Sequence, residues 1–330
     1  MLLHEYLENG ADKNPNFAFS EFEGNSLSYQ EANLLSNQLA NKLVSEGLEV
    51  GDRFAFLAKN CTEMAIMYYA ASKVGAVPVP LNYRLADQEW AYIINDSEAK
   101  LIIVKGNEYS DRINQISSEL KNVKKYISIS LDNSIEKFQD FYDWLSDSSN
   151  EKPTLKIHEN DDVYQMYTSG TTGHPKGAVL LQRNVAANIR QYLNSLTLPR
   201  PSRTLLVAPM YHAAAMINMC GCIAIGGTIV IQEDFIPQDV VDCLANEKIT
   251  HTVLVPAMIQ ACLVSVPNVA SNEYNDLDQI HYGASPIAPE TLKKAMDVFK
   301  CKFGQGFGMT ETVAVICLMT PEAVSYTHLT

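Results

Sequence analysis

The chain has 330 residues, of which 47% are hydrophobic and 19% charged, so it exceeds one typical domain and its composition excludes a disordered protein. Its 25 basic and 38 acidic residues give a net charge of −13, which argues against a nucleic-acid partner because binding a phosphate backbone needs a basic face. A free nucleotide stays possible, since a local loop can bind phosphate within an acidic protein.

The N-terminus begins MLLHE and lacks the basic start and apolar core of a signal peptide. Secretion is therefore not indicated, and we expect a cytoplasmic protein. The cysteines agree with a reducing compartment, because their number is odd and they show neither a C-x-x-C pair nor companion histidines at ligand spacing. We interpret them as core thiols: Cys61, Cys220, Cys222, Cys243, Cys262, Cys301 and Cys317.

The first 104 residues show a repeated alternation of helix and strand. Ser28 and Glu31 form a capping-box pattern, and apolar residues then recur on one helical face until Gly47. This alternation of helices and strands is typical of an α/β protein. The further elements expected here are strands at 53–58, 76–79 and 100–104, and helices at 62–73 and 87–95.

Residues 105–153 show a looser pattern, rich in serine, asparagine, aspartate and lysine. We predict one helix near 111–120 and interpret the rest as a peripheral stretch rather than a domain linker.

The stretch 167–177, YTSGTTGHPKG, holds three glycines, four hydroxyl residues and one lysine, and it follows a predicted strand at 162–166. Glycines let backbone N–H groups turn toward an anion, hydroxyls add donors and a lysine adds a point charge. A flexible surface loop would have a similar composition, but it would not need Lys176 held between Pro175 and Gly177. The loop of nucleotide triphosphatases is also a poor match, because Gly177 stands where their magnesium-binding Ser or Thr should be. The stretch therefore indicates a different phosphate loop.

Beyond this loop the alternation resumes. Residues 212–231 lack a formal charge over a length that would allow a membrane crossing, but His212, Asn218 and the pair Gly226 and Gly227 interrupt them. We predict a buried helix followed by a buried strand there. The other helices are expected near 184–196, 237–247, 257–264 and 289–299, and the strands near 204–208, 228–231, 250–255 and 279–282.

Three further motifs lie at predicted strand ends, where open α/β sheets place their ligands. They are PMYHA at 209–213, YGASP at 282–286 and GQGFGMTET at 304–312. Taken singly, each has an ordinary structural interpretation: a lone histidine entering an apolar helix, a strand-to-helix turn, and a flexible turn before an apolar strand at 313–318.

Together with the loop at 167–177, these motifs resemble the adenylate-forming superfamily, which includes acyl-CoA synthetases, nonribosomal adenylation domains and luciferases. The resemblance extends upstream through VPVPLNYRL at 77–85. It implies the α/β fold of the superfamily's large N-terminal domain, in which stacked mixed and parallel sheets carry flanking helices. Residues 1–323 would form part of that domain.

The resemblance also implies roles for individual residues. Lys176 would neutralise phosphate charge, His212 would orient the substrate, Thr310 would contact the α-phosphate, and Glu311 would hold Mg²⁺, which prefers hard oxygen ligands. Phe307 would stack on adenine, and it keeps the stacking face of the tyrosine that is common at this position. The remaining expected ATP-binding residues are Thr168, Ser169, Gly170, Thr171, Thr172, Gly173, Gly283, Ala284, Ser285, Gln305, Gly306 and Gly308.

The implied reaction is attack of a carboxylate oxygen on the α-phosphorus of ATP, giving an acyl-adenylate that CoA then converts to a thioester. Small and adaptable residues after His212 favour a fatty acid, and an aryl or amino acid carboxylate is the alternative. The oligomeric state is left open.

The chain departs from the superfamily pattern after Pro321. The usual Thr-Gly-Asp step, the hinge and the small C-terminal domain with its lysine do not follow, and residues 324–330 match no element that the pattern predicts. We therefore expect a truncated N-terminal domain with a tail that is foreign or out of frame. A nucleotide-binding remnant without turnover is the second hypothesis.

Overall fold

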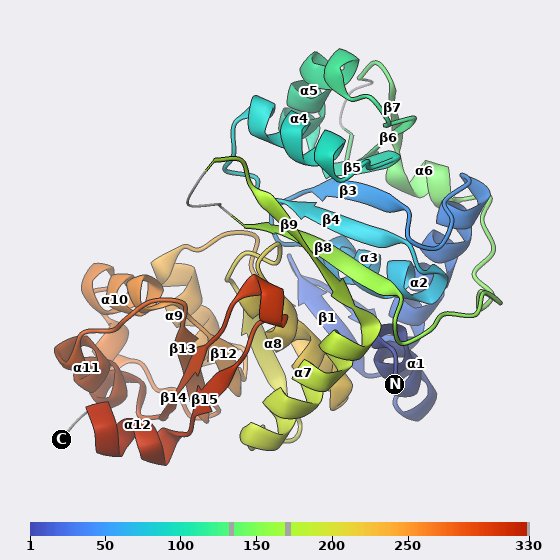
Figure 1. Cartoon of the computed structure of the whole chain (residues 1–330). Coiled ribbons are helices and arrows are strands. Elements are labelled where there is room, and N and C mark those ends of the chain that lie inside the picture. The colour runs from blue at the N-terminus through green and yellow to red at the C-terminus, as the bar shows by residue number, and fades with distance from the viewer. Residues whose placement is uncertain (132–134, 169–172, 329–330) are drawn as a thin grey trace. The chain divides into compact units, whose positions relative to one another are not determined.

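A five-stranded parallel sheet forms the centre of the first of two structural units (Figure 1). The computed structural model describes residues 1–131, 135–168 and 173–328. The first unit comprises Met1–Ala11 and Gln30–Ala186, and the second comprises Asp12–Tyr29 and Ala187–Thr330. The α/β fold with a mixed sheet, a parallel sheet and flanking helices agrees with the prediction.

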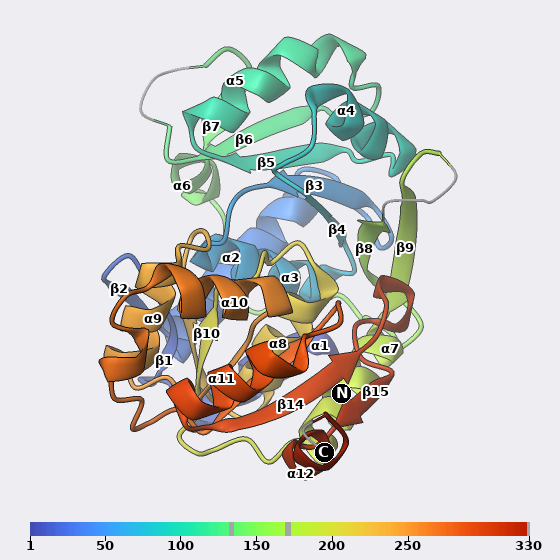
Figure 2. The ribbon, with the colours of Figure 1, turned by 90° about the vertical axis from the view of Figure 1, so that its left-hand side faces the viewer.

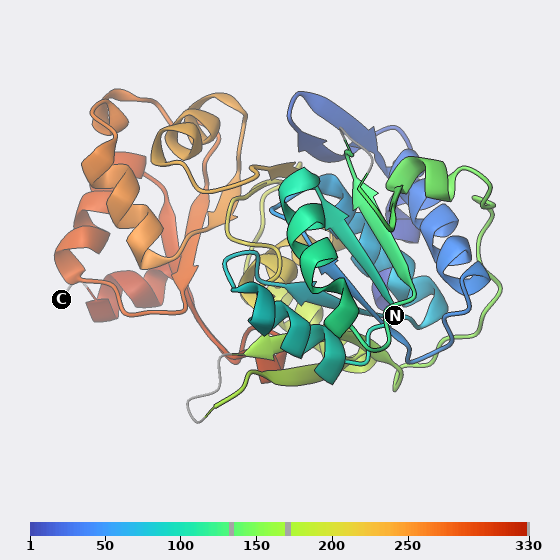
Figure 3. The same ribbon diagram turned by 90° about the horizontal axis from the view of Figure 1, so that it is seen from above.

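The strand order of the first sheet is β4-β3-β5-β6-β7, and all its pairings are parallel. Helices α4 and α5 cover one side of this sheet (Figure 1), and Figure 3 looks down on the same two helices. The elements of this unit are α1 (Leu3–Lys13), α2 (Tyr29–Ser45), β3 (Arg53–Leu57), α3 (Thr62–Val74), β4 (Val77–Leu81), α4 (Asp87–Asp96), β5 (Leu101–Lys105), α5 (Asn107–Ile116), β6 (Lys125–Ile129), β7 (Phe138–Asp140), α6 (Phe141–Leu145), β8 (Asp162–Thr168) and β9 (Lys176–Leu181).

The early helices and strands lie where the sequence predicts them. Helix α2 begins directly after Ser28, and α3 ends at Gly75, whose φ of 71° is left-handed and favours glycine. The interpretation of 105–153 as peripheral is wrong, because β6 pairs with β5 inside the sheet and α6 follows β7. The predicted helix at 111–120 begins four residues earlier, at Asn107.

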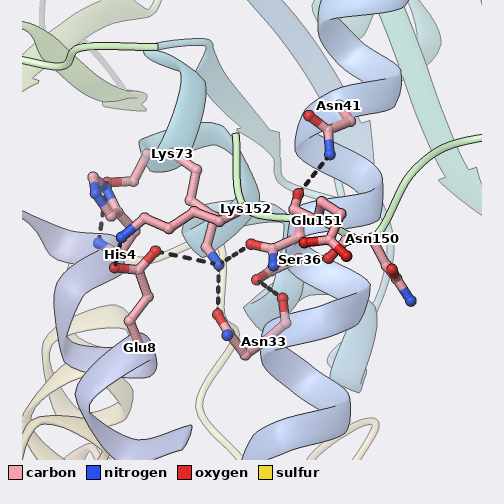
Figure 4. Close-up of polar contacts among 11 residues, drawn as sticks. His4, Glu8, Asn33, Ser36, Asn41, Lys73, Asn150, Glu151 and Lys152 are labelled. Carbon is pink, nitrogen blue, oxygen red and sulfur yellow. Dashed lines mark hydrogen bonds and ion pairs between the residues drawn. The ribbon is translucent and has the colours of Figure 1, made fainter. Parts of the chain in front are cut away.

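A buried lysine ties together three helices of the first unit (Figure 4). Lys73 of α3 donates hydrogen bonds to Asn33 Oδ1 (2.6 Å) and Asn37 Oδ1 (2.5 Å) of α2, and its ammonium lies 3.7 Å from the Glu8 carboxylate of α1. Burial lowers the pKa of Lys73 to about 8. The amide of Asn37 also donates to the Asn150 carbonyl, so the same cluster fastens the chain that leads toward β8.

The second unit is built on an eight-stranded mixed sheet with the order β15-β14-β13-β12-β10-β11-β1-β2. Its inner pairings are parallel, and the β14–β15 and β1–β2 pairs are antiparallel. Helices α9, α10 and α11 lie on one face (Figure 2) and share an apolar core with the strands. The elements are β1 (Ala18–Phe22), β2 (Asn25–Ser28), α7 (Gln182–Ser195, which begins in the first unit), β10 (Arg203–Leu206), α8 (Ala213–Ala224), β11 (Thr228–Ile231), α9 (Pro237–Asn246), β12 (His251–Val253), α10 (Pro256–Ser265), β13 (Gln279–Gly283), α11 (Pro289–Phe299), β14 (Lys302–Phe307), β15 (Cys317–Met319) and α12 (Pro321–His328).

The uncharged stretch 212–231 is a helix followed by a strand, α8 and β11, as predicted. None of the helices in the described ranges combines the length and apolar character that a membrane crossing requires. At the end of the chain, where the sequence pattern predicted no element, helix α12 reaches His328 and buries Val324 in the apolar core of the second unit.

Candidate functional site

The predicted phosphate loop connects two strands of an antiparallel hairpin, β8 and β9. Thr168 pairs with Lys176, and the Thr168 hydroxyl donates to the Lys176 carbonyl at 3.5 Å. Gly173 has a φ of 145°, which favours glycine, and Lys176 is exposed. Ser169, Gly170, Thr171 and Thr172 lie outside the described residues.

The hairpin changes the interpretation of Gly177. The sequence placed Lys176 and Gly177 in a loop, whereas both belong to β9. A Cβ at position 177 would overlap the Gln165 side-chain amide and come within 2.9 Å of Tyr167 Cζ. Glycine is therefore required by the packing of the hairpin, and no helix N-terminus follows this phosphate loop as one follows the triphosphatase loop.

The other predicted site residues lie at the carboxyl edge of the second unit's sheet. β10, β12, β13 and β14 run parallel side by side, so His212, which follows β10, lies at the same edge as Gly283 and Gly306. Gly283 pairs directly with Gly306, and Tyr282 pairs with Gln305. This is the edge at which open α/β sheets bind ligands. Lys176 belongs to the first unit, so the predicted residues are divided between the two units.

Backbone approaches at this edge are too close for side chains. A Cβ on Gly283 would overlap the Gly306 carbonyl, and a Cβ on Gly308 would overlap the Ala314 carbonyl. The neighbouring Ala284 has a φ of 65°, an uncommon left-handed conformation for a residue other than glycine. Ala284 and Ser285 are exposed.

Phe307 and Met309 project large apolar side chains into solvent at the end of β14, with exposed fractions of 62% and 50%. An exposed aromatic ring beside backbone that carries no Cβ suits a flat base, so the residues present fit an adenine ring.

Thr310 and Glu311 lie in the short helix Thr310–Thr312 that follows β14. Glu311 is exposed, and Val313 directly after the helix has a φ of 73°, a strained conformation for a β-branched residue. The strand predicted at 313–318 is correspondingly wrong, since only Cys317–Met319 is extended.

His212 is the residue before α8, and its carbonyl accepts hydrogen bonds from Ala215 and Met216. Its ring centroid lies 4.3 Å from that of Tyr211, and its side chain is exposed. The lone histidine therefore stands at the sheet edge rather than inside the helix.

Among the described residues, no group of three or more His, Cys, Asp or Glu side chains could hold a metal ion. Glu311 alone would need oxygens from a bound substrate to complete a magnesium shell. Magnesium usually accepts such sharing, because it is bound through one or two carboxylates together with phosphates and water.

The sequence interpretation did not anticipate two buried histidines on the face opposite the apolar core. His251 and His281 are turned to the same face as Thr204, which bonds Asn218 of α8 at 2.9 Å. Within the part of the chain that the structure describes, neither His281 ring nitrogen nor His251 Nε2 has a hydrogen-bond partner. Burial lowers the pKa of His251 to about 3 and that of His281 to about 4.

Acidification should therefore destabilise the protein through these histidines. Between about pH 6.5, where unfolded histidine titrates, and about pH 4, only the unfolded chain binds the proton, so stability falls as the pH falls. Each histidine contributes a slope of up to about 1.4 kcal/mol per pH unit. We expect His281→Gln to flatten the decline of Tm over this window, and the exposed His158→Gln to leave it unchanged. Equal slopes in both variants would contradict this assignment.

Comparisons with known protein families and structures find proteins similar to this chain. The model of the AMP-binding enzyme family matches residues 7–328. The long-chain-fatty-acid–CoA ligase FadD13 of Mycobacterium tuberculosis is 30% identical over 87% of this chain and 55% of its own length. The feruloyl-CoA synthase of an Amycolatopsis species is 29% identical over 90% of this chain and 57% of its own length.

Among solved structures, the N-terminal domain of FACL13 from Mycobacterium tuberculosis matches with a TM-score of 0.89 and 26% identity. The match covers 98% of this chain and 80% of that domain. The chain thus spans slightly more than half the length of the curated relatives named above.

Proposed function

Because the chain belongs to the family of AMP-binding enzymes, we propose that it carries the ATP-binding, carboxylate-activating part of an acid–thiol ligase. The observation that supports this most directly is the glycine pair Gly283 and Gly306 beside the exposed Phe307, at the sheet edge where His212 also lies. The family's relatives include ligases that join carboxylic acids to CoA, as their names state.

In this proposal the adenine ring lies against Gly283, Ala284 and Ser285 and stacks on Phe307. Thr310 contacts the α-phosphate, and His212 orients the substrate carboxylate. Lys176 offsets the charge of the β- and γ-phosphates. The supporting backbone groups are those of Thr168, Ser169, Gly170, Thr171, Thr172, Gly173, Gln305, Gly306 and Gly308.

The chemistry is a displacement at phosphorus. A carboxylate oxygen forms a bond to the α-phosphorus while the bond to the bridging oxygen breaks, and pyrophosphate leaves with that electron pair. The protein's task is to position the reactants and to neutralise charge. Mg²⁺ held by Glu311 would supply further charge neutralisation on the phosphates.

The second half-reaction, in which a CoA thiolate displaces AMP, belongs in this proposal to the whole protein. Residues 1–323 are then part of the large N-terminal domain, because the chain spans only 55% of the FadD13 length. A nucleotide-binding remnant without turnover remains the alternative.

We propose a fatty acid as the substrate. The residues after His212 support this choice, because Ala213, Ala215 and Met216 are small or adaptable and buried. An aryl carboxylate is the runner-up, since a feruloyl-CoA synthase is among the relatives. An amino acid is less favoured, because residues 209–216 contain no acidic side chain that could bind an ammonium group.

A pyrophosphate-exchange assay with a panel of fatty, aryl and amino acids tests the proposal. We expect exchange with fatty acids, and we expect Lys176→Ala to lower its rate by at least about tenfold, which corresponds to the loss of one charge interaction. The exposed Lys156→Ala is the control and should keep the rate. ATP binding without exchange across the whole panel would favour the remnant, and a chain that binds no ATP would contradict both functions.

A further inference from the structure

The two strands of the phosphate hairpin, β8 and β9, are both attached to the last turn of one helix, α4. On the β8 side, Tyr167 donates its hydroxyl proton to Asp96 Oδ2 at 2.6 Å. Tyr167 is the first residue of the stretch 167–177 and is paired with Gly177, the last one, across the hairpin. Burial and the Asp96 carboxylate raise the pKa of Tyr167, so the hydroxyl stays protonated and remains a donor.

On the β9 side, the contact comes from Tyr92, one helical turn before Asp96. The Tyr92 ring stacks on the His174 ring with centroids 4.6 Å apart and an interplanar angle of 18°. The Tyr92 hydroxyl donates to the Pro175 carbonyl at 3.3 Å. Because residues four apart lie on one helix face, Tyr92 and Asp96 can hold the two sides of the hairpin at once.

The attachment continues into the sheet of the first unit. Gln165 donates to the Tyr167 hydroxyl at 3.0 Å, and Arg53 of β3 donates to Gln165 at 3.2 Å. Arg53 also forms an ion pair with Asp162 at the start of β8 (2.9 Å). The hairpin is therefore linked by polar side chains to both a helix and a strand of the unit.

We propose that Tyr92, Asp96 and Tyr167 are positioning residues that fix the direction in which the hairpin presents Thr168 and Lys176 to the phosphates of ATP. The inference rests on the proposed function. A two-stranded hairpin is marginal by itself, so its orientation depends on such contacts. Asp96 is exposed, so its bond with Tyr167 adds little to global stability, whereas a small displacement of a phosphate ligand costs much in binding and rate.

The test compares Tyr167→Phe, Asp96→Ala and the double variant with a matched control. Tyr142→Phe is the control, because Tyr142 donates to Glu63 at 2.9 Å in the same kind of tyrosine–carboxylate bond, on α6 and away from the hairpin. Pyrophosphate exchange gives KM for ATP and kcat. Hydrogen exchange of residues 173–181 without ligand reports the hairpin directly.

We expect each single variant to raise KM for ATP about tenfold while KM for the carboxylic acid stays unchanged. The double variant should lose less than the sum of the two single variants, because both remove the bond between Tyr167 and Asp96. Amides of residues 173–181 should exchange faster in these variants than in Tyr142→Phe, with the same change in Tm as the control.

Unchanged hydrogen exchange of the hairpin amides or an unchanged KM for ATP would overturn the inference. Normal pyrophosphate exchange by the parent chain would still leave the proposed function standing. If the parent chain binds no ATP, both fail together, and a hairpin loosened by Tyr167→Phe would then have only a structural meaning.

Discussion

Replacing Lys73 by methionine is expected to lower the free energy of unfolding by about 2–4 kcal/mol, which is a large part of the usual stability of a protein. The Lys73 side chain is 2% exposed, and removing its ammonium leaves two amide oxygens without this donor. The Glu8 carboxylate then keeps only the exposed Lys152, at 2.8 Å, as its lysine partner. A buried acceptor that loses its partner keeps its full desolvation cost. Because the pKa of Lys73 is about 8, the lysine is charged at pH 7, where denaturant unfolding should be measured.

Two further variants separate the buried charge from the loss of a side chain. Lys42→Met removes a lysine of α2, whose ammonium lies 2.6 Å from the Asp147 carboxylate. Because Asp147 is 75% exposed, water replaces the lost partner, and we expect the free energy of unfolding to fall by about 1 kcal/mol or less. Adding Glu8→Leu to Lys73→Met should recover part of the stability, because it removes a mostly buried carboxylate that has lost one of its two lysine partners. A loss in Lys73→Met no larger than that in Lys42→Met would show that the buried cluster carries no special weight.

Replacing Gly308 by alanine is expected to lower the pyrophosphate-exchange rate by about 100-fold or more. The added Cβ would overlap the Ala314 carbonyl, and backbone atoms cannot move aside as a flexible side chain can. The short helix with Thr310 and Glu311 lies between these two positions, so relief of the overlap must displace it. A displacement of about 1 Å in a catalytic group is enough for a loss of this size.

The steric control is Gly306→Ala, two residues earlier and still within β14. Its Cβ would meet only Leu318 Cδ2 at 3.6 Å, an ordinary contact, so its Tm should stay close to that of the parent chain. Gly308→Ala should lower Tm more than Gly306→Ala does. A pyrophosphate-exchange rate in Gly308→Ala equal to that of the parent chain would contradict the proposed role of the turn at residues 308–314.

The sequence predicted the helices and strands of the alternating regions well, because their apolar periodicity matched their final burial. The strands that were missed contain polar or small residues, so they are placed in the sheet by pairing with their neighbours and not by an apolar pattern. β6 begins with Lys125 and contains Ser128, yet it joins the sheet beside β5. β14 contains glycines that weaken a strand on their own, yet it pairs with β13, where a Cβ on Gly283 would overlap the Gly306 carbonyl.

The residues of the candidate site were also predicted only in part. Motifs carried by consecutive residues, such as 282–286 and 304–312, were visible in the sequence, and the order of parallel strands brings them to one edge. The bond between Asp96 and Tyr167 was not visible, because it joins residues 71 positions apart and Asp96 stands in no motif. His281 was missed because strand burial was inferred from apolar residues, and a buried neutral histidine leaves no such signal.

The hairpin β8–β9 forms a sheet of only two strands, although β8 packs near β4. The hairpin is therefore joined to the rest of its unit by the packing of buried side chains and a few polar bonds rather than by a continuous hydrogen-bond ladder. Such a segment opens at a lower free-energy cost than the core of its unit. Heating should then abolish the proposed pyrophosphate exchange several degrees before circular dichroism records unfolding, so the temperature limit of that activity is set by this hairpin and not by the core.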